Sequence, residues 1–313
     1  SCTVCPHHCE VNRFQTKKGI CLTGSMPVVS SICDHHGEEP CLSGTNGAGT
    51  VFLGSCNLRC VYCQNYQISQ NTGIIDENEM SYEELAENLI WLQNIKKCHN
   101  IEFVSPSHFV PHIVKAIYMA VKIGLNIPIV YNSNGYDDLD TLKLLDGIID
   151  IYLPDIKYGD DETGIKYSKV KNYFTVAKAA VKEMSRQVGS LVLDENGIAQ
   201  RGLIIRHLIL PNDVAKTKTV LDFIADYLPQ NVTISLMAQY YPANRAKNFQ
   251  MINRNITQAE LDEVYDYMCS LGFSNGYVQT LEAQSYYRPN FEFEHPFERK
   301  QKPAHVHAHT ISS

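Results

Sequence analysis

Short apolar runs alternate along the chain with longer segments of helical periodicity. The apolar runs predict buried strands at residues 50–54, 101–104, 127–131, 148–153, 203–210, 232–237 and 276–280. Apolar residues recur at helical spacing near residues 110–123, 138–146, 163–187, 215–228 and 257–271. Such alternation is typical of right-handed βαβ units and a parallel sheet. Seven strands are fewer than the eight of a closed barrel, so the pattern predicts an open α/β sheet.

A serine and a glutamate mark the start of one more helix, after the first predicted strand. Ser81 and Glu84 have the spacing of a capping box, in which each side chain accepts a hydrogen bond from the other residue's backbone amide. Leu85, Leu89 and Leu92 then repeat along one apolar face. We therefore predict an amphipathic helix that begins directly after Ser81.

Composition places the chain among globular proteins with a large core. Its 313 residues are 44% apolar, which favours one large α/β domain with an appendage. We divide it into a Cys/His-rich module (1–48), a central α/β domain (49–285) and a C-terminal extension (286–313). The net charge of −7 argues against nucleic acid as a partner, and no apolar run has the ~20 residues of a membrane span. The start of the chain lacks the basic and apolar regions of a signal peptide.

Three cysteines follow the first predicted strand in a C-x3-C-x2-C pattern: Cys56, Cys60 and Cys63. Three soft thiolates without an obvious fourth ligand suit an iron–sulfur cluster with one free iron. Zinc is the competing metal, but its structural sites usually close with a fourth Cys or His, and no His occurs in residues 37–98. Three buried structural thiols are a third reading, which Asn57 and Arg59 between the cysteines disfavour.

A second group of cysteines lies near the start of the chain. Cys2, Cys5, Cys9 and Cys21 make a four-thiolate candidate site for zinc or a second iron–sulfur cluster. The alternative is that they are reduced cysteines in a loop-rich cap. Nine of the eleven cysteines precede residue 64 in metal-type spacings, and a large core needs no disulfides. We therefore expect a reducing, cytoplasmic location.

Ligands of parallel α/β sheets bind at the carboxyl ends of the strands. The residues that follow the predicted strands are 105–108, 132–136, 155–157, 211–212 and 239–241, together with the cysteine loop. We expect these segments to surround one opening. Glu38 and Glu39, which precede the first of the predicted parallel strands, suit either acid–base or ligand work, or a hydrogen-bonded turn.

With Tyr62 before its last cysteine, the cysteine loop resembles the C-x3-C-x-aromatic-C motif of radical S-adenosylmethionine (SAM) enzymes. The resemblance covers residues 2–290 and is nearest to the pyruvate formate-lyase activating enzyme-like subgroup, on residues 36–41 and 152–158. It implies a partial (β/α)6-type TIM barrel with a small Cys-rich N-terminal module. It also implies that Cys56, Cys60 and Cys63 hold a [4Fe-4S] cluster whose open iron binds SAM.

The resemblance also implies which residues contact SAM. Tyr62 corresponds to the aromatic residue at the adenine, Asn134 to the Asn-Gly that meets SAM, and Asp155 and Lys157 to residues beside its methionine end. Arg206 corresponds to an arginine that meets its carboxylate or ribose. Each residue has a structural alternative: packing for Tyr62, a turn for Asn134, and ion pairs for the charged residues.

This chain departs from the family pattern at three strand ends. Ser105 and Ser107 stand where the family has Gly-Gly-Glu, so their hydroxyls, or backbone carbonyls, would have to accept the amino group of SAM. Asn132 replaces an aspartate of the activating enzymes, and Gln239 lies where they have a histidine. These differences weaken the case for pyruvate formate-lyase itself as the substrate.

The expected function is reductive SAM cleavage and hydrogen abstraction, with activation of a glycyl radical enzyme as the version that the resemblance favours. The first alternative is radical modification of another peptide or a small molecule. The second is a non-enzymatic iron–sulfur or zinc protein. The expected partners are a protein or peptide substrate and a one-electron donor such as flavodoxin or ferredoxin. We expect residues 291–297 to cover the open side of the barrel and His305, His307 and His309 to lie in a solvated tail.

Overall fold

A computed structural model of the chain describes residues 1–16, 19–71, 73, 75, 77–286, 288–293, 296–297 and 309–310. Its sheet follows a single path, β1-β2-β3-β4-β5-β7-β8-β9-β10, with β6 paired to β7. The strands are β1 (Val29–His35), β2 (Ala48–Leu53), β3 (Ile101–Val104), β4 (Ile129–Asn132), β5 (Ile151–Tyr152), β6 (Val192–Leu193), β7 (Ala199–Leu208), β8 (Thr233–Met237), β9 (Gly276–Val278) and β10 (His309–Thr310).

The seven strands from β2 to β9, without β6, are all parallel, which confirms the seven predicted strands. The parallel set therefore has one strand more than the (β/α)6 arrangement that the resemblance implies. The antiparallel strands β1, β6 and β10 are additions to the parallel set. Of the predicted histidine tail, His309 lies in β10, whereas His305 and His307 are outside the described residues.

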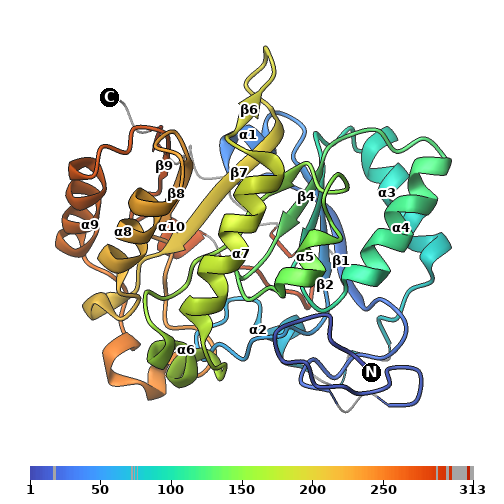
Figure 1. The fold of residues 1–313 in the computed structure, drawn as a ribbon, viewed down its shortest axis with the longest axis horizontal. Coiled ribbons are helices and arrows are strands. Elements are labelled where there is room, and N and C mark those ends of the chain that lie inside the picture. The colour runs from blue at the N-terminus through green and yellow to red at the C-terminus, as the bar shows by residue number, and fades with distance from the viewer. Residues whose placement is uncertain are drawn as a thin grey trace.

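The helices are α1 (Pro40–Ser43), α2 (Tyr66–Ser69), α3 (Tyr82–Asn94), α4 (Val110–Lys122), α5 (Leu139–Lys143), α6 (Asp161–Ser168), α7 (Tyr173–Val188), α8 (Thr217–Tyr227), α9 (Gln258–Ser270) and α10 (Ala283–Tyr286). The longer ones cover the outer face of the sheet. Figure 1 shows α4, α5, α7, α8 and α9 crossing the sheet in sequence order, from the right of the view to the left. Large apolar side chains of these helices and of the strands form the main core between the two layers.

The N-terminal segment contributes a strand to the main sheet. β1 pairs antiparallel with β2, with Cys33 opposite Thr50. The predicted boundary between residues 48 and 49 therefore falls inside β2. Every residue of β2 is buried, and without β1 the backbone groups on that side would have no partners. Pairing with β1 satisfies them, which a reading of the chain by composition did not anticipate.

The predicted start of α3 is confirmed, but only half of its capping box forms. The Ser81 hydroxyl accepts a hydrogen bond from the Glu84 amide at 3.1 Å. The reciprocal arrangement occurs instead at α9, between Thr257 and Glu260. There Arg254 pairs with the Glu260 carboxylate and fixes it beside the helix start.

The segment predicted as one helix at residues 163–187 is two helices, α6 and α7. Lys169 ends α6 with a left-handed backbone, φ 62°, and Asn172 precedes α7 with φ 55°. Left-handed residues cannot continue an α-helix, and hydrophobic periodicity does not report the sign of φ. The periodic pattern therefore continues across a break in the backbone.

We expect Lys169→Gly to raise the free energy of unfolding by up to about 1 kcal/mol, because glycine adopts the left-handed conformation without steric cost. Lys166→Gly is the matched control in the helical part of α6 and should lower it by about 1 kcal/mol. Urea unfolding measures both values. Destabilisation by Lys169→Gly would contradict the assigned backbone conformation.

The two ends of the sheet approach each other around an internal cavity. Phe52 of β2 lines it on one side, and Ser235 and Met237 of β8 line it on the other. Since strands near both ends of the path reach one cavity, the sheet is curled into an open, partial barrel, as predicted. Phe297 also lines the cavity and lies 5.4 Å from the Phe52 ring. This part of residues 291–297 thus covers the gap, while Glu294 and His295 are outside the described residues.

Candidate active site

The cavity inside the partial barrel has a volume of about 350 Å³. It lies at the carboxyl ends of the parallel strands, where the sequence predicted the site. Nine residues predicted to hold the cluster or SAM line it: Cys56, Cys60, Tyr62, Cys63, Ser105, Asn134, Asp155, Lys157 and Arg206. Side chains from segments 150 residues apart thus share one opening, as the strand-end rule requires.

Two predicted groups lie elsewhere. Ser107 is buried beside Asp137 and is not part of the cavity lining, so only Ser105 of the two serines faces the site. The thiols of Cys2, Cys5, Cys9 and Cys21 also lie outside the lining.

Arg59 holds the cysteine loop in place. Its guanidinium donates to the carbonyl oxygens of Cys56 at 2.9 Å, Ser69 at 3.0 Å and Ile20 at 2.6 Å. The backbone amide of Arg59 also donates to the Ser168 carbonyl at 3.0 Å. These bonds connect the loop to the N-terminal segment and to α6. The charged residue between the cysteines therefore has a positioning role.

Each cysteine of the loop has a polar neighbour. The Cys60 and Cys63 sulfurs lie 2.9 Å from the Ser168 hydroxyl and 3.1 Å from the Ser69 hydroxyl, respectively. The Asn134 amide donates to the Cys56 sulfur at 3.4 Å. Outer contacts of this kind orient metal ligands and tune the bound metal.

Burial raises the pKa of the Cys60 thiol to about 12, although the nearby Lys157 ammonium opposes the shift. Burial also raises the pKa of Cys63. Both groups are therefore neutral thiols at pH 7 until a metal displaces the proton. Within the described residues, no three His, Cys, Asp or Glu side chains are arranged to hold a single metal ion. Three cavity-lining thiols fit an iron–sulfur cluster, in which each cysteine binds a different iron.

Asn134 and Gly135 form a tight turn against the loop. The Asn134 amide donates to the Asn57 side-chain oxygen at 2.7 Å, and its own oxygen accepts from the Tyr136 amide at 3.0 Å. Gly135 has φ 76°, and a Cβ there would collide with the carbonyl oxygen of Asp155. The Asn-Gly pair is thus required by the turn and also contacts the cysteine loop.

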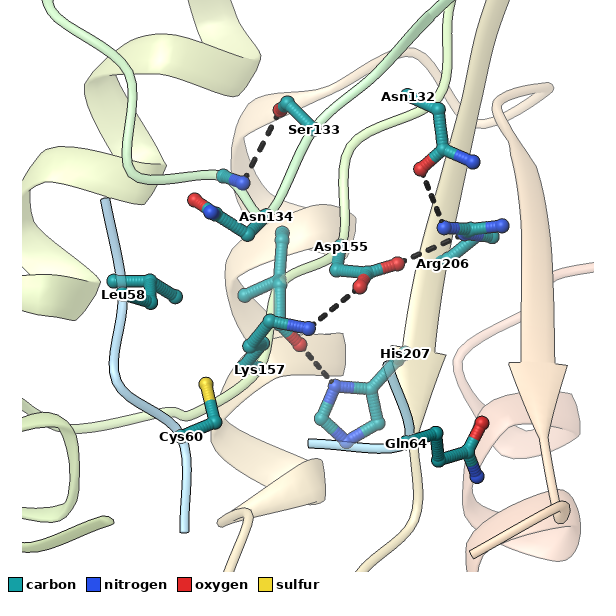
Figure 2. Close-up of polar contacts among 12 residues, drawn as sticks. Leu58, Cys60, Gln64, Asn132, Ser133, Asn134, Asp155, Lys157, Arg206 and His207 are labelled. Atoms are coloured by element: carbon teal, nitrogen blue, oxygen red, sulfur yellow. Dashed lines mark hydrogen bonds and ion pairs between the residues drawn. The ribbon is translucent and has the colours of Figure 1, made fainter. Parts of the chain in front are cut away.

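A buried ion-pair network runs through the cavity wall (Figure 2). Asp155 accepts from Lys157 at 2.6 Å and from Arg206 at 2.8 Å. Arg206 also donates to Glu38 at 3.0 Å and to the Asn132 side chain at 2.6 Å. Burial alone would raise the pKa of Asp155, but the charges of Arg206 and Lys157 outweigh it and lower that pKa. The structure thus contains the internal ion pairs that were the alternative to SAM contacts, on residues that still line the cavity.

Tyr62 is buried among aromatic rings. It meets Tyr158 and Tyr240 edge to face, at centroid distances of 6.3 and 5.8 Å. Tyr62 therefore packs the loop against the sheet and also lines the cavity. His207, next to Arg206 in β7, points to the opposite face and contacts the Ile156 carbonyl at 2.6 Å and the Thr217 hydroxyl at 2.9 Å.

Sequence reasoning missed Glu102, which is fully buried in β3 and hydrogen-bonds Asn132. A carboxylate within the apolar run of residues 101–104 was a usable signal, because an unpaired charge there is costly. It also missed Gln64 and Gln279, which line the cavity beside the predicted strand-end residue Gln239. Gln239 lies 3.3 Å from Gln64 and 3.0 Å from Gln279.

The N-terminal thiols gather beside the cysteine loop. Burial raises the pKa of Cys5 to about 12, and Cys21, Cys2 and Cys9 lie near enough to add to the shift. The Ser55 hydroxyl donates to the Cys21 carbonyl, directly before the first cysteine of the loop. The four N-terminal thiols thus lie close together, but in the described structure they are not arranged to hold a single metal ion.

Comparison with known proteins decides the family. A sequence model of the radical SAM superfamily matches residues 50–193, which include the cysteine loop. The uncharacterized protein MJ0674 of Methanocaldococcus jannaschii is 34% identical over 271 residues, 85% of this chain and 73% of that protein. This chain belongs to the radical SAM superfamily. The uncharacterized protein MJ0808 of the same organism is 26% identical over 161 residues, 46% of each chain.

Solved structures also resemble the chain, at low identity. A domain of pyruvate-formate lyase-activating enzyme from Bacteroides vulgatus has 12% identity and a TM-score of 0.39, over 55% of this chain and 91% of that one. Methylornithine synthase (PylB) has 16% identity and a TM-score of 0.49, over 82% of this chain and 78% of that one. TYW1 with a bound lysine-pyruvate adduct has 10% identity and a TM-score of 0.45, over 75% of this chain and 78% of that one. Likeness at this level transfers no activity or substrate.

No helix in the described part of this radical SAM protein is long and apolar enough to span a membrane.

Proposed function

We propose that this protein reductively cleaves SAM at a [4Fe-4S] cluster held by Cys56, Cys60 and Cys63. One observation carries the proposal: the three thiols line the same cavity as the polar residues at the strand ends. The cluster would supply one electron, and cleavage of SAM a 5′-deoxyadenosyl radical that abstracts hydrogen from the substrate. All the remaining tasks fall to the chain.

We assign the protein two tasks: to hold SAM and to exclude water. The cavity wall offers Tyr62 for the adenine, Asn134 and Ser105 for polar groups, and the Asp155–Lys157–Arg206 network for the methionine end. This network is already paired internally, so it is rigid before SAM arrives. Such preorganisation reduces the free energy needed to orient a charged ligand. Phe297, which packs against His35 and Phe52, would shield the open side of the barrel from solvent.

We further propose that the abstracted hydrogen belongs to a glycine of a partner enzyme. Residues 36–41 and 152–158, which resemble the activating enzymes, support this version, and both contribute to the cavity. Another peptide or a small molecule is the second candidate. The electron donor we propose is a flavodoxin or a ferredoxin, and the compartment a reducing cytoplasm, because all eleven cysteines are free thiols.

The N-terminal thiols stay a candidate second metal site. Their gathering around Cys5 supports the proposal. Zinc and iron content of a Cys5→Ser variant tests it, since the loss of one zinc, or of about four irons, relative to the unmodified protein would reveal such a site. Equal metal content in both proteins would show that these cysteines bind no metal.

Two measurements test the proposed function. Reconstituted, dithionite-reduced protein is expected to convert SAM to 5′-deoxyadenosine and methionine, which chromatography detects. EPR after mixing with a glycyl radical enzyme is expected to show a carbon-centred doublet. SAM cleavage without the doublet would favour another substrate, and no cleavage would contradict the enzymatic assignment.

A further inference from the structure

The inner part of the cavity carries more carboxyl groups than cationic groups. Glu38 and Glu39 line it, and Asp155 lies beside them across Arg206. Glu102 is fully buried and does not line the cavity itself, but it is close enough to interact with both glutamates and with Arg206. We call these four carboxyl groups with Arg206 the acidic floor. Arg206 and the adjacent Lys157, which pairs with Asp155, are the nearby cations, so the four carboxyl groups outnumber the cations by two.

Both cations already form ion pairs with carboxylates of the floor. Asp155 accepts from both Lys157 and Arg206, and one oxygen of Glu38 accepts from Arg206. His35 lies 3.7 Å from the other Glu38 oxygen, but burial lowers its pKa to about 3, so it is neutral at pH 7 and adds no charge. The cations therefore leave two carboxyl groups without a charged partner.

The unpaired atoms belong to Glu39 and Glu102. Within the described residues, one carboxyl oxygen of each, Oε2, has no hydrogen-bond partner. Glu39 is only 7% exposed, and Glu102 is fully buried. A buried polar atom without a partner is costly, and native proteins rarely keep one unless a ligand, an ion or water completes the site.

Burial raises the pKa values of Glu38, Glu39 and Glu102, while Arg206 opposes the shift in each case. Without a further cation these groups therefore favour the neutral, protonated form. A cation that enters the cavity would stabilise their carboxylate forms. The floor is thus complementary to positive charge, even though it contains an arginine.

We propose that the acidic floor binds an ammonium or guanidinium group of the substrate, with Glu38 and Glu39 as the residues that face it. The inference rests on the proposed function, because it assumes that substrate occupies this cavity. A basic group of a peptide, or of a small amine, fits the chemistry. Planar guanidinium groups pair especially well with two carboxylates.

SAM itself carries an amino group, but the position of the floor favours the substrate. Lys157 lies near Cys60, and a chain of ion pairs leads from Lys157 through Asp155 and Arg206 to Glu38. Glu38 thus stands at the far end of this chain, with three charged side chains between it and Cys60. By resemblance, the amino group of SAM binds iron at that loop and leaves the floor to a second ligand.

The test compares two probes of nearly equal shape, methylguanidinium chloride and neutral N-methylurea. Both are titrated anaerobically into the reconstituted protein at constant ionic strength, with binding followed by ligand-observed NMR. We expect methylguanidinium to bind at least about tenfold more tightly than N-methylurea, since it alone carries charge. Glu39→Gln should weaken methylguanidinium binding about tenfold, whereas the exposed Glu263→Gln should leave it unchanged.

A repeat in saturating SAM identifies the occupant. Retained methylguanidinium binding supports a substrate site, and competitive loss would assign the floor to SAM and overturn the proposal. Equal binding of the two probes would overturn it as well. Glu38→Gln is the second variant if Glu39→Gln does not fold, as judged by its unfolding curve. The assay requires no turnover, so its failure is distinguishable from a failure to form 5′-deoxyadenosine.

Discussion

Cys60→Ala is expected to abolish SAM cleavage, with 5′-deoxyadenosine formation reduced by about 10³-fold or more, because a radical SAM cluster requires all three thiolates. Cys60 is the buried central cysteine of the loop, between Ser168 and Lys157. Without Cys60 only two thiols remain in the loop. Two thiols are too few to bind the three irons that the cysteines are proposed to hold. Iron content of the anaerobically reconstituted variant should fall together with the activity.

Cys98→Ala is the matched control for this variant. Cys98 is also buried and free, but it lies in the loop between α3 and β3 and does not line the cavity. The control should keep its iron and its SAM cleavage. SAM cleavage by Cys60→Ala at the unmodified rate would show that Cys56, Cys60 and Cys63 are not the cluster ligands.

Asp155→Asn is expected to lower the free energy of unfolding by about 3–5 kcal/mol, because it leaves two buried cations without their shared carboxylate. The Asp155 side chain is only 14% exposed and contacts both Lys157 and Arg206. Asparagine keeps the size of the side chain but removes its charge. Urea unfolding of the anaerobically purified protein without SAM measures the loss.

The surface pair between Asp146 and Arg186 provides the control. Its side chains are 45% and 57% exposed, so Asp146→Asn should cost no more than about 1 kcal/mol. Equal effects of the two substitutions would show that the network in the cavity wall is not a buried ion-pair system.

The stability that Asp155 contributes should also depend on pH. The folded-state pKa of this carboxyl lies below its unfolded value of about 3.9. Its contribution is therefore fully present above about pH 4 and is lost as the pH falls through the folded pKa. We expect the stability difference between the unmodified protein and Asp155→Asn to be constant from about pH 5 to 8 and to shrink in more acidic solution. A difference that grows below about pH 4 would contradict this assignment.

The parallel sheet was predictable because a buried strand between helices leaves a strong apolar signal. The runs at residues 101–104 and 232–237 predict β3 and β8 almost to the residue. β1 was missed because its exposure pattern is irregular, with three consecutive half-buried residues. The break between α6 and α7 depends on the backbone of Lys169 and Asn172, which hydrophobic periodicity does not encode.

The candidate site was predictable where chemistry follows directly from a motif or a strand end. Cys56, Cys60 and Cys63 stand in one motif, and Asp155 follows a strand. Glu38 and Glu39 were candidates from the sequence, but Glu102 comes close to them only through folding, which brings β3 near the segment before α1. Pairing among distant charges requires the three-dimensional arrangement, which a single sequence does not supply.

Reduced-state EPR of the anaerobically reconstituted protein, recorded with and without SAM alongside its iron and sulfide content, tests the central claim most directly. We expect about four irons bound by Cys56, Cys60 and Cys63, and a signal that changes when SAM is added. Additional iron or zinc would locate a second metal in the N-terminal thiols. Zinc alone, or a cluster signal that SAM leaves unchanged, would contradict the assignment of this cavity as a SAM-cleaving site.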